Sequence, residues 1–585
     1  MKYSRILLVV LAFALIVTAC TPTPTATPVP PTAAPKPTDA PKPTDAPKPT
    51  AAPAATTAPA PTTAPAATKA PEPTKAATTD GGTLIGAFDV GPGGGPQQRP
   101  FDNSAGNTWM LKLWSPLVSL NKDSTGLEPQ LATKWSSNPN ATVWTFNLRP
   151  NVKWHDGTAF TANDMKFTFE LACNPAFGWR YDQGVCPNLV GITEYMSGTV
   201  KSLASVKVVD PQTIEFLLKN TDPKFPYKML WAYALPQHKL KDQDPAKLAK
   251  SDWFLTEPVG TGPFKIFKYV KDQYMDLVPN ENYWAGKPKL GHLINRYFAD
   301  EAAATIALEK GEIQFSYISG DVAARLKTNN AYKVFEGSSF TSNYVIFNLR
   351  DKRLQDVRVR QAFMYAIDRK AIIKEIWKDT AYLIPCTLPQ KDFWPSDVNA
   401  YDYNPTKAQQ LLKDAGWNAG DSFEFWTYYT AQQQKDALQA MQQYLAQVGI
   451  KVTPKIMDVP AYNATFYTGE GWQFSYRGYG MPTGQSPRLA LLNSVQTNDK
   501  KPWGGNADPT LGQLLDKAEQ SLVDADYTKG MQAVCKHLND QVIEAPMWVG
   551  IRYGAITNKV KNFYYYPAPA GGPYEDHPEL WEVSQ

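Results

Sequence analysis

Residues 141–172, ATVWTFNLRPNVKWHDGTAFTANDMKFTFELA, carry the clearest succession of strand, turn and helix signals in the chain. Apolar and polar side chains alternate at 143–148, which is typical of a half-buried strand. The His-Asp-Gly sequence at 155–157 predicts a turn. Thr161 is placed to cap a helix that has Asp164 in its first turn. A strand, a turn and a helix in this order predict an α/β unit.

The same succession continues along the chain. Residues 205–220 (SVKVVDPQTIEFLLKN) predict a hairpin around an Asp-Pro turn. Residues 342–349 predict a buried strand, and residues 357–377 predict one helix with a strong apolar face. Because strands and helices alternate, we expect an α/β body with mixed sheets.

The N-terminus has a different character. Lys2 and Arg5 precede an apolar run of about a dozen residues, which is shorter than the roughly 20 that a membrane helix needs. Such a run is typical of a secretory signal. It closes on VTAC at 17–20, which resembles the bacterial lipobox. The resemblance implies removal of residues 1–19 and a lipid on Cys20, which would anchor the chain to the outer face of the cytoplasmic membrane. An ordinary secretion signal cut near Ala19 is the alternative.

A tether follows the cysteine. Residues 21–80 contain no Leu, Ile, Met or aromatic residue, so they cannot build a core. Their many prolines fix φ and remove backbone donors. We therefore expect residues 20–80 to be a lipidated Cys and an extended, solvated Pro/Thr/Ala-rich tether, with a reach of at most about 3.1 Å per residue.

Composition limits the remaining body. It is too long for one core, so two or more lobes are expected. The net charge of +4 over 585 residues gives no reason to expect nucleic acid. The five histidines are scattered and no CxxC occurs, so we expect no metal site. The chain has no GxxxxGK[ST] motif for ATP, and no cofactor is expected. No recognisable nucleophile accompanies His155 and Asp156, so we expect no catalytic residue and no enzyme.

Four cysteines lie in the body, and they allow three pairings. An exported protein can oxidise them. We prefer Cys173 with Cys186, because the loop between them is short and rich in Gly and Pro. The partners of Cys386 and Cys535 stay open.

Seven segments, in order, resemble family 5 of the extracellular solute-binding proteins, the oligopeptide- and dipeptide-binding group of ABC importers. Each is short, but their common order over about residues 83–565 makes chance implausible. The segments are PQLATKWSS…ATVWTFNLRPNVKWHDGTAFTANDMKFTFE, VGTGPFKI, LEKGEIQF, IFNLRDKRLQDVRVRQAFMYAIDRKAII, YNPTKAQQLLKDAGW, LAQVGIKV and DPTLGQLLDKAE.

The resemblance implies a two-lobe periplasmic-binding-protein-like fold with an extra inserted subdomain, mixed sheets and a two-strand hinge near 340–348 and 547–558. Ligand would bridge the lobes and stabilise the closed state. The closed monomer would dock on an ABC permease that a separate ATPase powers. The implied bounds are 81–127, 252–340 and 548–585 for the core subdomain of lobe 1, 128–251 for its inserted subdomain, and 341–547 for lobe 2.

The solute class stays open between oligopeptide and oligosaccharide. Peptide binders of this family often carry an acidic residue for the peptide amine in the stretch comparable to 470–488, EGWQFSYRGYGMPTGQSPR. Here no Asp or Glu follows Trp472 in that stretch, and the expected position falls near Met481 or Pro482. We expect instead a loop whose aromatic faces could stack on sugar rings and whose Arg could donate to hydroxyls or carboxylates. The candidate ligand contacts are Trp394, Trp472, Tyr476, Arg477, Tyr479 and Trp503.

Overall fold

The computed structural model describes residues 81–88, 110–121, 126–177, 185–466, 468–480, 491, 508–565 and 575–584. All of them belong to one compact unit, Ala70–Gln585, which we call the body. Among these residues, none of the helices has the length and apolar character that crossing a membrane requires.

One mixed sheet runs through the body, and it has eleven strands among the described residues. The pairs β14–β15, β14–β16, β1–β10 and β1–β11 are parallel and the others are antiparallel, so the mixed sheet expected from the sequence is confirmed. The main path is β15 (Lys451–Ile456), β14 (Ser422–Thr427), β16 (Phe474–Gly480), β12 (Tyr332–Phe347), β17 (Glu544–Thr557), β11 (Phe315–Ile318), β1 (Thr83–Ala87), β10 (His292–Arg296), β9 (Tyr274–Pro279) and β8 (Phe264–Val270), with β13 (Ala381–Leu383) paired to β17.

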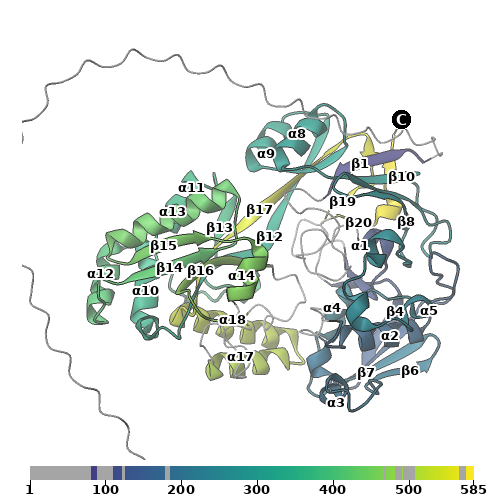
Figure 1. The fold of residues 1–585 in the computed structure, drawn as a ribbon, viewed down its shortest axis with the longest axis horizontal. Helices are drawn as coiled ribbons and strands as arrows, with labels where there is room; N and C mark the ends of the chain where they lie inside the picture. Colours follow the sequence, from purple (N-terminus) through teal and green to yellow (C-terminus); the bar gives the residue numbers. More distant parts are fainter. Residues whose placement is uncertain are drawn as a thin grey trace, which may run out of the picture. The chain divides into compact units, whose positions relative to one another are not determined.

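Two long strands join the halves of this sheet. β12 has 16 residues and β17 has 14, and they pair antiparallel from Tyr332↔Thr557 to Ile346↔Glu544. Figure 1 shows them as a two-strand bridge between two groups of elements. We call the group with β1 and β8–β11 lobe 1, and the group with β13–β16 lobe 2.

The stretch that opened the sequence analysis forms a subdomain with its own antiparallel sheet, β4 (Ala132–Ser137), β5 (Val143–Leu148), β7 (Thr213–Leu217) and β6 (Val206–Asp210). Helix α2 (Ala162–Ala172) covers this sheet. Thr161 caps it, and the Asp164 side chain accepts from the Thr161 amide in a capping box. The strand, the capped helix and the hairpin predicted from sequence are thus confirmed.

Short elements complete lobe 1. They are α1 (Met110–Leu113), β2 (Val118–Leu120), β3 (Leu127–Pro129), α3 (Ile192–Met196), α4 (Phe225–Lys228), α5 (Gln237–Leu240), α6 (Pro245–Leu248), α7 (Trp253–Thr256), α8 (Glu301–Glu309), α9 (Gly320–Leu326), β18 (Val560–Lys561), β19 (Tyr564–Tyr565), β20 (Glu575–Asp576) and β21 (Glu582–Val583).

The helices of lobe 2 pack on both faces of its part of the sheet. They are α10 (Val357–Ala366), α11 (Arg369–Glu375), α12 (Pro405–Asp414), α13 (Gln432–Gln447), α14 (Val459–Phe466), α17 (Pro509–Glu519) and α18 (Asp524–Gln541). The single helix expected over 357–377 is wrong. Ile367 is extended, and the Asp368 side chain accepts from the Ala371 amide and so caps a second helix.

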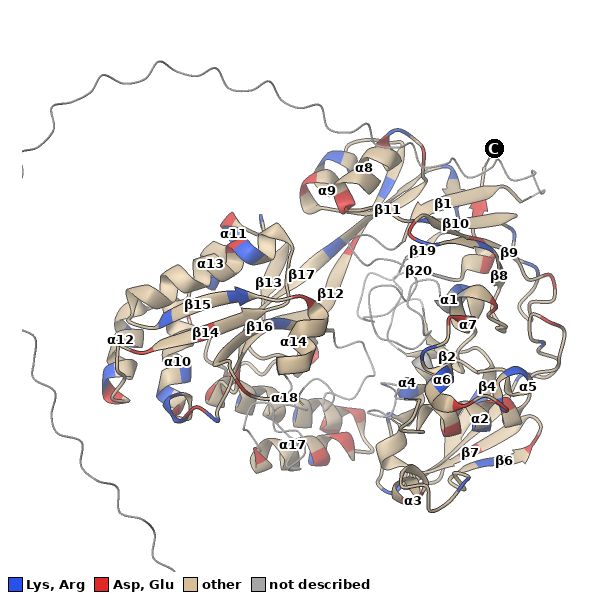
Figure 2. Cartoon of the chain, viewed as in Figure 1, with Lys and Arg blue, Asp and Glu red and all other residues tan. Residues whose placement is uncertain are grey.

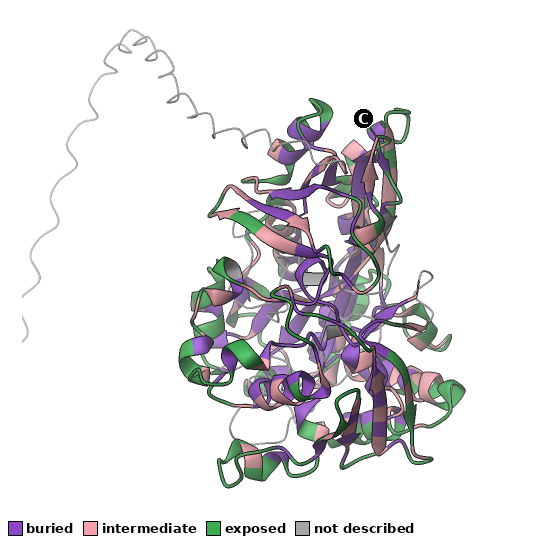
Figure 3. Cartoon of the chain, turned by 90° about the vertical axis from the view of Figure 1, so that its right-hand side faces the viewer, coloured by how far each residue is buried: buried purple, intermediate pink, exposed green. Residues whose placement is uncertain are grey.

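Buried residues are concentrated in the strands, and charged residues lie mainly on the helices and loops. The strands are largely buried while the outer helix faces and loops are exposed (Figure 3). Charged positions of both signs are spread over helices and loops, and none of the elements labelled in Figure 2 carries a long run of one sign. This distribution accords with the small net charge of +4.

Two disulfides cross-link different parts of the body. Cys173 pairs with Cys186 in the subdomain of α2, and this is the pair preferred from the sequence. Cys386 pairs with Cys535, which lies 149 residues further along the chain. The second bond lies within lobe 2 and joins the segment after β13 to α18.

Candidate functional site

The pairing of the two crossing strands shifts register at two places of β12, between Ser338 and Ser342 and between Asn343 and Tyr344, and the first shift is the larger. Ser338 pairs with Ile551 and Ser342 pairs with Val549, so three residues of β12 lie opposite Gly550 alone. Phe340, within this bulge, has a φ of 50°, in the left-handed region that bulky residues rarely adopt. A bulge interrupts the ladder and bends the strand locally. This larger bulge is therefore a place where the two-strand bridge can bend.

The sheet neighbours change at the same place. On its other edge, β17 pairs with β11 of lobe 1 through residues 553–556 and with β13 of lobe 2 through residues 548–550. The second edge of β12 pairs with β16 of lobe 2 from Thr341 onwards. β17 is thus paired with lobe 1 on one side of the bulge and with lobe 2 on the other, whereas the second strand partner of β12 comes from lobe 2 alone. The bulge therefore lies at the boundary between the lobes, and we call it the hinge bulge.

A row of side chains crosses the sheet beside the hinge. Tyr382 pairs with Val549, Val549 with Ser342, and Ser342 with Tyr479, so the four side chains share one face. The Ser342 hydroxyl is buried without a hydrogen-bond partner among the described residues. The Tyr382 hydroxyl lies 2.7 Å from Ser338 Oγ in the bulge. The row has a tyrosine at each end and a valine and a serine between them.

Trp394 lies next to this row. Its ring centroid is 6.3 Å from that of Tyr382. Trp394 and Tyr479 are both half-buried and pack against the same apolar cluster, which includes Cys386 and Leu388. The structure therefore brings together two of the six residues that the sequence predicted as ligand contacts. Tyr382 and Ser342 were missed, because only long-range strand pairing places them here.

The edge of β16 that faces away from β12 has no strand partner at 477–480 among the described residues. β14 pairs with β16 only as far as Tyr476. The Tyr428 hydroxyl lies 3.1 Å from the Gly478 carbonyl oxygen and 3.3 Å from its amide nitrogen. Strand alternation directs the amide and carbonyl of Gly480 to the same edge. Two glycines in a strand permit close approach of another chain.

Tyr429 supports this edge from the opposite face. Its hydroxyl donates to Asn343 Oδ1 at 2.9 Å. Burial is the largest of several causes that raise the pKa of Tyr429 well above its usual value, while the charge of Arg477 lowers it. The phenol therefore remains protonated and keeps its donor role at all physiological pH values.

Replacing Gly478 with Ala is expected to cost about 1–3 kcal/mol of stability through overpacking. A Cβ there would lie 2.2 Å from the Tyr429 hydroxyl and 3.0 Å from a methyl group of Thr341, so the bond to Asn343 would break. Gly480→Ala is the control, because its Cβ would meet nothing closer than 3.6 Å. Urea unfolding checks the prediction, and equal midpoints for the two variants would contradict it.

The loop expected at 470–488 is wrong where the chain is described, because β16 occupies 474–480. Trp472 is 1% exposed and stacks on Phe466 at 4.7 Å. Tyr476 is 0% exposed and packs against Trp548. Tyr476 lies in a strand covered on both faces and Trp472 is covered by α14, so neither ring presents a face to a solute here. The expectation that they stack on ligand is therefore corrected.

Arg477 is also buried, with its guanidinium carbon 4.8 Å from the centre of the Phe466 ring. It points to the α14 side of the sheet. Trp503, Cys20 and the positions near Met481 and Pro482 lie outside the described residues. Within the described part of the chain, no His, Cys, Asp and Glu side chains are grouped as metal ligands would be.

Comparison with known proteins places this geometry in context. A model of the bacterial extracellular solute-binding proteins, family 5 Middle, matches residues 126–501. A Brucella melitensis protein described provisionally as an ABC transporter peptide-binding protein is 38% identical over 514 residues, which are 86% of this chain and 94% of that protein. The dipeptide-binding protein of Escherichia coli strain K12 is 28% identical over 361 residues, 60% of this chain and 66% of its own.

A solved structure shares the fold. The oligopeptide-binding protein of Bacillus subtilis, determined in complex with a nonapeptide, matches with a TM-score of 0.71 and 20% identity. The match covers 86% of this chain and 99% of that one. The two-lobe α/β fold class expected from the sequence is thereby confirmed.

Proposed function

Because the chain belongs to family 5 of the bacterial extracellular solute-binding proteins, we propose that it captures an oligopeptide and delivers it to the permease of an ABC importer. The single observation that carries the peptide assignment is the edge of β16 at 477–480 on the side away from β12, where no described strand pairs with Gly480 and the Tyr428 hydroxyl alone bonds the backbone of Gly478 among the described residues. An extended peptide can add to such an edge through its main chain. Its relatives' descriptions as peptide-binding and dipeptide-binding proteins support the same assignment.

Hinge closure provides the capture step. A peptide on the β16 edge would be held by lobe 2 alone while the lobes are apart, and by both lobes after the crossing strands bend at the bulge. Ligand can shift this balance only by binding the closed state more tightly than the open one. The protein transports its solute unchanged, and no residue described here is assigned a catalytic role.

The N-terminus supports a place at the membrane surface. We propose that Cys20 carries lipid and that residues 21–80 act as the tether between this anchor and the body. A monomeric body on a long tether could load solute at a distance and then meet the permease, while the partner ATPase supplies the energy.

An oligosaccharide is the second candidate solute. Its support is the lack of acidic residues after Trp472 in the stretch 470–488. The burial of Trp472 and Tyr476 removes two of the aromatic faces on which this alternative depended. Half-buried Trp394 and Tyr479 still allow stacking, so the test below includes sugars.

Binding of alanine peptides of two to five residues is the direct test, measured as thermal shift on residues 21–585 beside malto- and xylo-oligosaccharides. Ligand at 100 times its Kd stabilises the folded state by about 2.7 kcal/mol, so the midpoint should rise by a few degrees with peptides only. A rise with oligosaccharides only would replace the peptide with a sugar. No rise with either class would reject both.

Main-chain pairing makes a sharper prediction for the best peptide of that panel. Because alternate residues of a paired strand face the partner, N-methylation of one alternate set of amides should weaken binding about 3- to 10-fold per lost hydrogen bond. N-methylation of the other set is the matched control and should change affinity little. Calorimetry checks this, and equal losses for both sets would exclude β-strand addition.

A further inference from the structure

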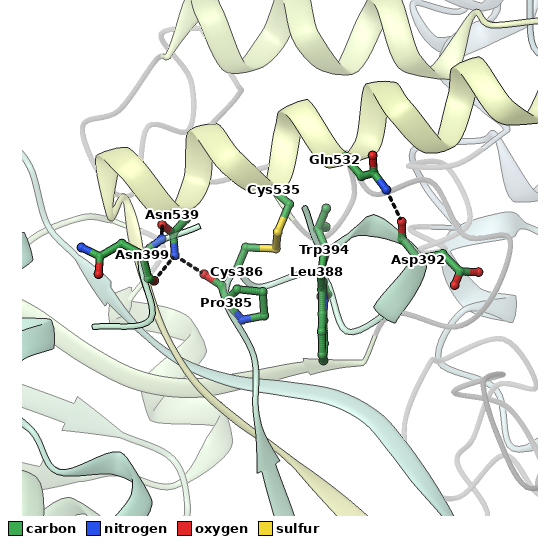
Figure 4. The surroundings of a disulfide bond; sticks show 9 residues. All are labelled: Pro385, Cys386, Leu388, Asp392, Trp394, Asn399, Gln532, Cys535 and Asn539. Carbon is green, nitrogen blue, oxygen red and sulfur yellow. Dashed lines mark hydrogen bonds between the residues drawn. A yellow bond between two sulfur atoms is a disulfide. The ribbon is translucent and has the colours of Figure 1, made fainter. Parts of the chain in front are cut away.

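The segment after β13, residues 384–400, crosses α18 and is fastened to it along one face of the helix. We call this segment the strap. The Cys386–Cys535 disulfide is the covalent fastening. The side chains of Gln532 and Asn539 lie on the same face of α18, because positions three, four and seven apart are neighbours on a helix. Figure 4 shows all three attachments side by side.

The noncovalent attachments flank the disulfide. Gln532 Nε2 donates to the Asp392 carbonyl at 3.0 Å. Asn539 Nδ2 donates to the carbonyls of Pro385 and Asn399 at 2.8 and 2.9 Å, and Asn539 Oδ1 accepts from the Asn399 amide at 2.9 Å. Both ends of the strap are therefore anchored to α18, by the disulfide and the Asn539 hydrogen bonds, and Gln532 holds the turn between them.

The strap sets the orientation of Trp394. The indole Nε1 donates to the Leu388 carbonyl at 2.8 Å, so the ring is tied to backbone only two residues beyond Cys386 (Figure 4). The ring then faces Tyr382, with a centroid distance of 6.3 Å and an interplanar angle of 50°. Tyr382 in turn reaches the hinge bulge through Ser338. The Cys386–Cys535 disulfide is thus connected to the hinge bulge through Trp394 and Tyr382.

We infer that Trp394 is a specificity-determining contact for an aromatic or large apolar side chain of the solute, and that the Cys386–Cys535 disulfide is the positioning element that holds it beside Tyr382. The inference rests on the proposed peptide function. Apart from one short 3-10 turn (Lys391–Phe393), the strap has no regular structure of its own. Without the disulfide, its first part keeps the hydrogen bond to Asn539 and the packing of Leu388 in the apolar cluster, but the covalent restraint two residues before the Leu388 carbonyl that orients the indole is lost.

The chemistry of the neighbourhood fits such a side chain. The rings of Tyr382 and Tyr479, at the ends of the row that contains the buried Ser342, are half-buried, as is the neighbouring ring of Trp394. Aromatic pairs favour offset or tilted contacts at centroid distances of 4.5–7 Å, which the Tyr382–Trp394 pair already shows. An added ring from a peptide could extend this pair, whereas an alanine side chain could not.

The test uses penta-alanine and the five peptides that carry one Phe at each position, titrated calorimetrically into residues 21–585. Wild type should prefer one Phe peptide over penta-alanine. Trp394→Ala should reduce that preference about three- to tenfold, the size of one aromatic contact, and Trp394→Phe should restore part of it. A merely structural role would weaken all six peptides equally and leave the preference unchanged.

The disulfide is tested by Cys386→Ala with Cys535→Ala, which should lose the Phe preference as Trp394→Ala does. Cys173→Ala with Cys186→Ala is the matched control and should keep it. In that control protein a reductant opens only Cys386–Cys535 among the described cysteines, so reduction should abolish the preference and reoxidation should return it. Near-UV circular dichroism verifies that each variant is folded.

The outcomes separate the two proposals. If wild type binds none of the peptides, the proposed function fails and this inference fails with it. If wild type binds peptides without a Phe preference, or if Trp394→Ala keeps the preference, the Trp394 contact is refuted while the peptide function stands. If Trp394→Ala loses the preference and the disulfide variant keeps it, the positioning role of the disulfide is refuted.

Discussion

Loss of the Cys386–Cys535 disulfide should lower the free energy of unfolding by about 5 kcal/mol, against about 3 kcal/mol for Cys173–Cys186. The difference comes from loop length, because the first bond spans 149 residues and the second spans 13. A cross-link restricts the unfolded chain more when it closes a longer loop. Both pairs are buried, so neither variant gains solvation that would offset the loss.

Paired Cys→Ala variants and urea unfolding measure this ranking. Because Cys386–Cys535 links the strap to α18 within lobe 2, its loss should shift the unfolding transition of lobe 2 to lower urea more than that of lobe 1. The Cys173–Cys186 variant is the control for loss of a disulfide as such. Equal losses of unfolding free energy in the two variants would contradict the loop-length explanation, and so would a larger loss for the Cys173–Cys186 variant.

The elements with strong local signals are those that the sequence predicted well. Residues 143–148 alternate because one strand face is buried, and Thr161 with Asp164 forms a capping box within four residues. Such signals need no knowledge of the rest of the chain. The hairpin around residues 210 and 211 is another example, since its partner strands are neighbours in sequence.

Errors arose where distant parts of the chain decide the local structure. β16 contains Gly, Tyr and Arg and was expected to be a loop, yet pairing with β12 and β14 makes it an inner strand. The missed break at Ile367 has a local cause instead. The apolar pattern of 357–377 continues across it, and the cap at Asp368, which starts the second helix, was overlooked.

The candidate site depends even more on distant pairing. Trp394 and Tyr479 were predicted as contacts, but their common neighbours Tyr382 and Ser342 come from β13 and β12. The hinge bulge appears only once Ser338 and Ser342 are paired with β17. The Cys386–Cys535 pairing likewise joins residues 149 apart, and three pairings were equally allowed by count.

Acid should destabilise the body through His155, whose ring joins the turn at 155–157 to the one that precedes β8. The His155 Nδ1 accepts from the Gly260 amide at 3.1 Å, which fixes the proton on Nε2, and Nε2 then donates to the Gly262 carbonyl at 3.1 Å. Burial is the largest cause that lowers the pKa of His155 to about 4, and the charge of Lys265 adds to it. A second proton, on Nδ1, would point at the Gly260 amide hydrogen and so break the hydrogen bond that Nδ1 accepts.

The pH range follows from the two pKa values. Above about pH 6.5 the imidazole is neutral in both states and the full stability is present. As the pH falls from 6.5 towards 4, the unfolded chain binds a proton that the folded chain does not, so stability falls by about 3 kcal/mol in total. Below pH 4 both states are protonated, and His155 causes no further loss.

His155→Gln separates this effect from other acid-sensitive groups. The amide keeps one donor and one acceptor but does not titrate, so at pH 7 the variant should lose only about 1–2 kcal/mol from poorer hydrogen bonds. Urea unfolding at pH 7, 6, 5 and 4 should show the wild type losing stability faster than the variant and falling below it near pH 4. Parallel losses for the two proteins would mean that the folded imidazole binds its proton as readily as the unfolded one, and the hydrogen bonds to Gly260 and Gly262 would then not exclude it.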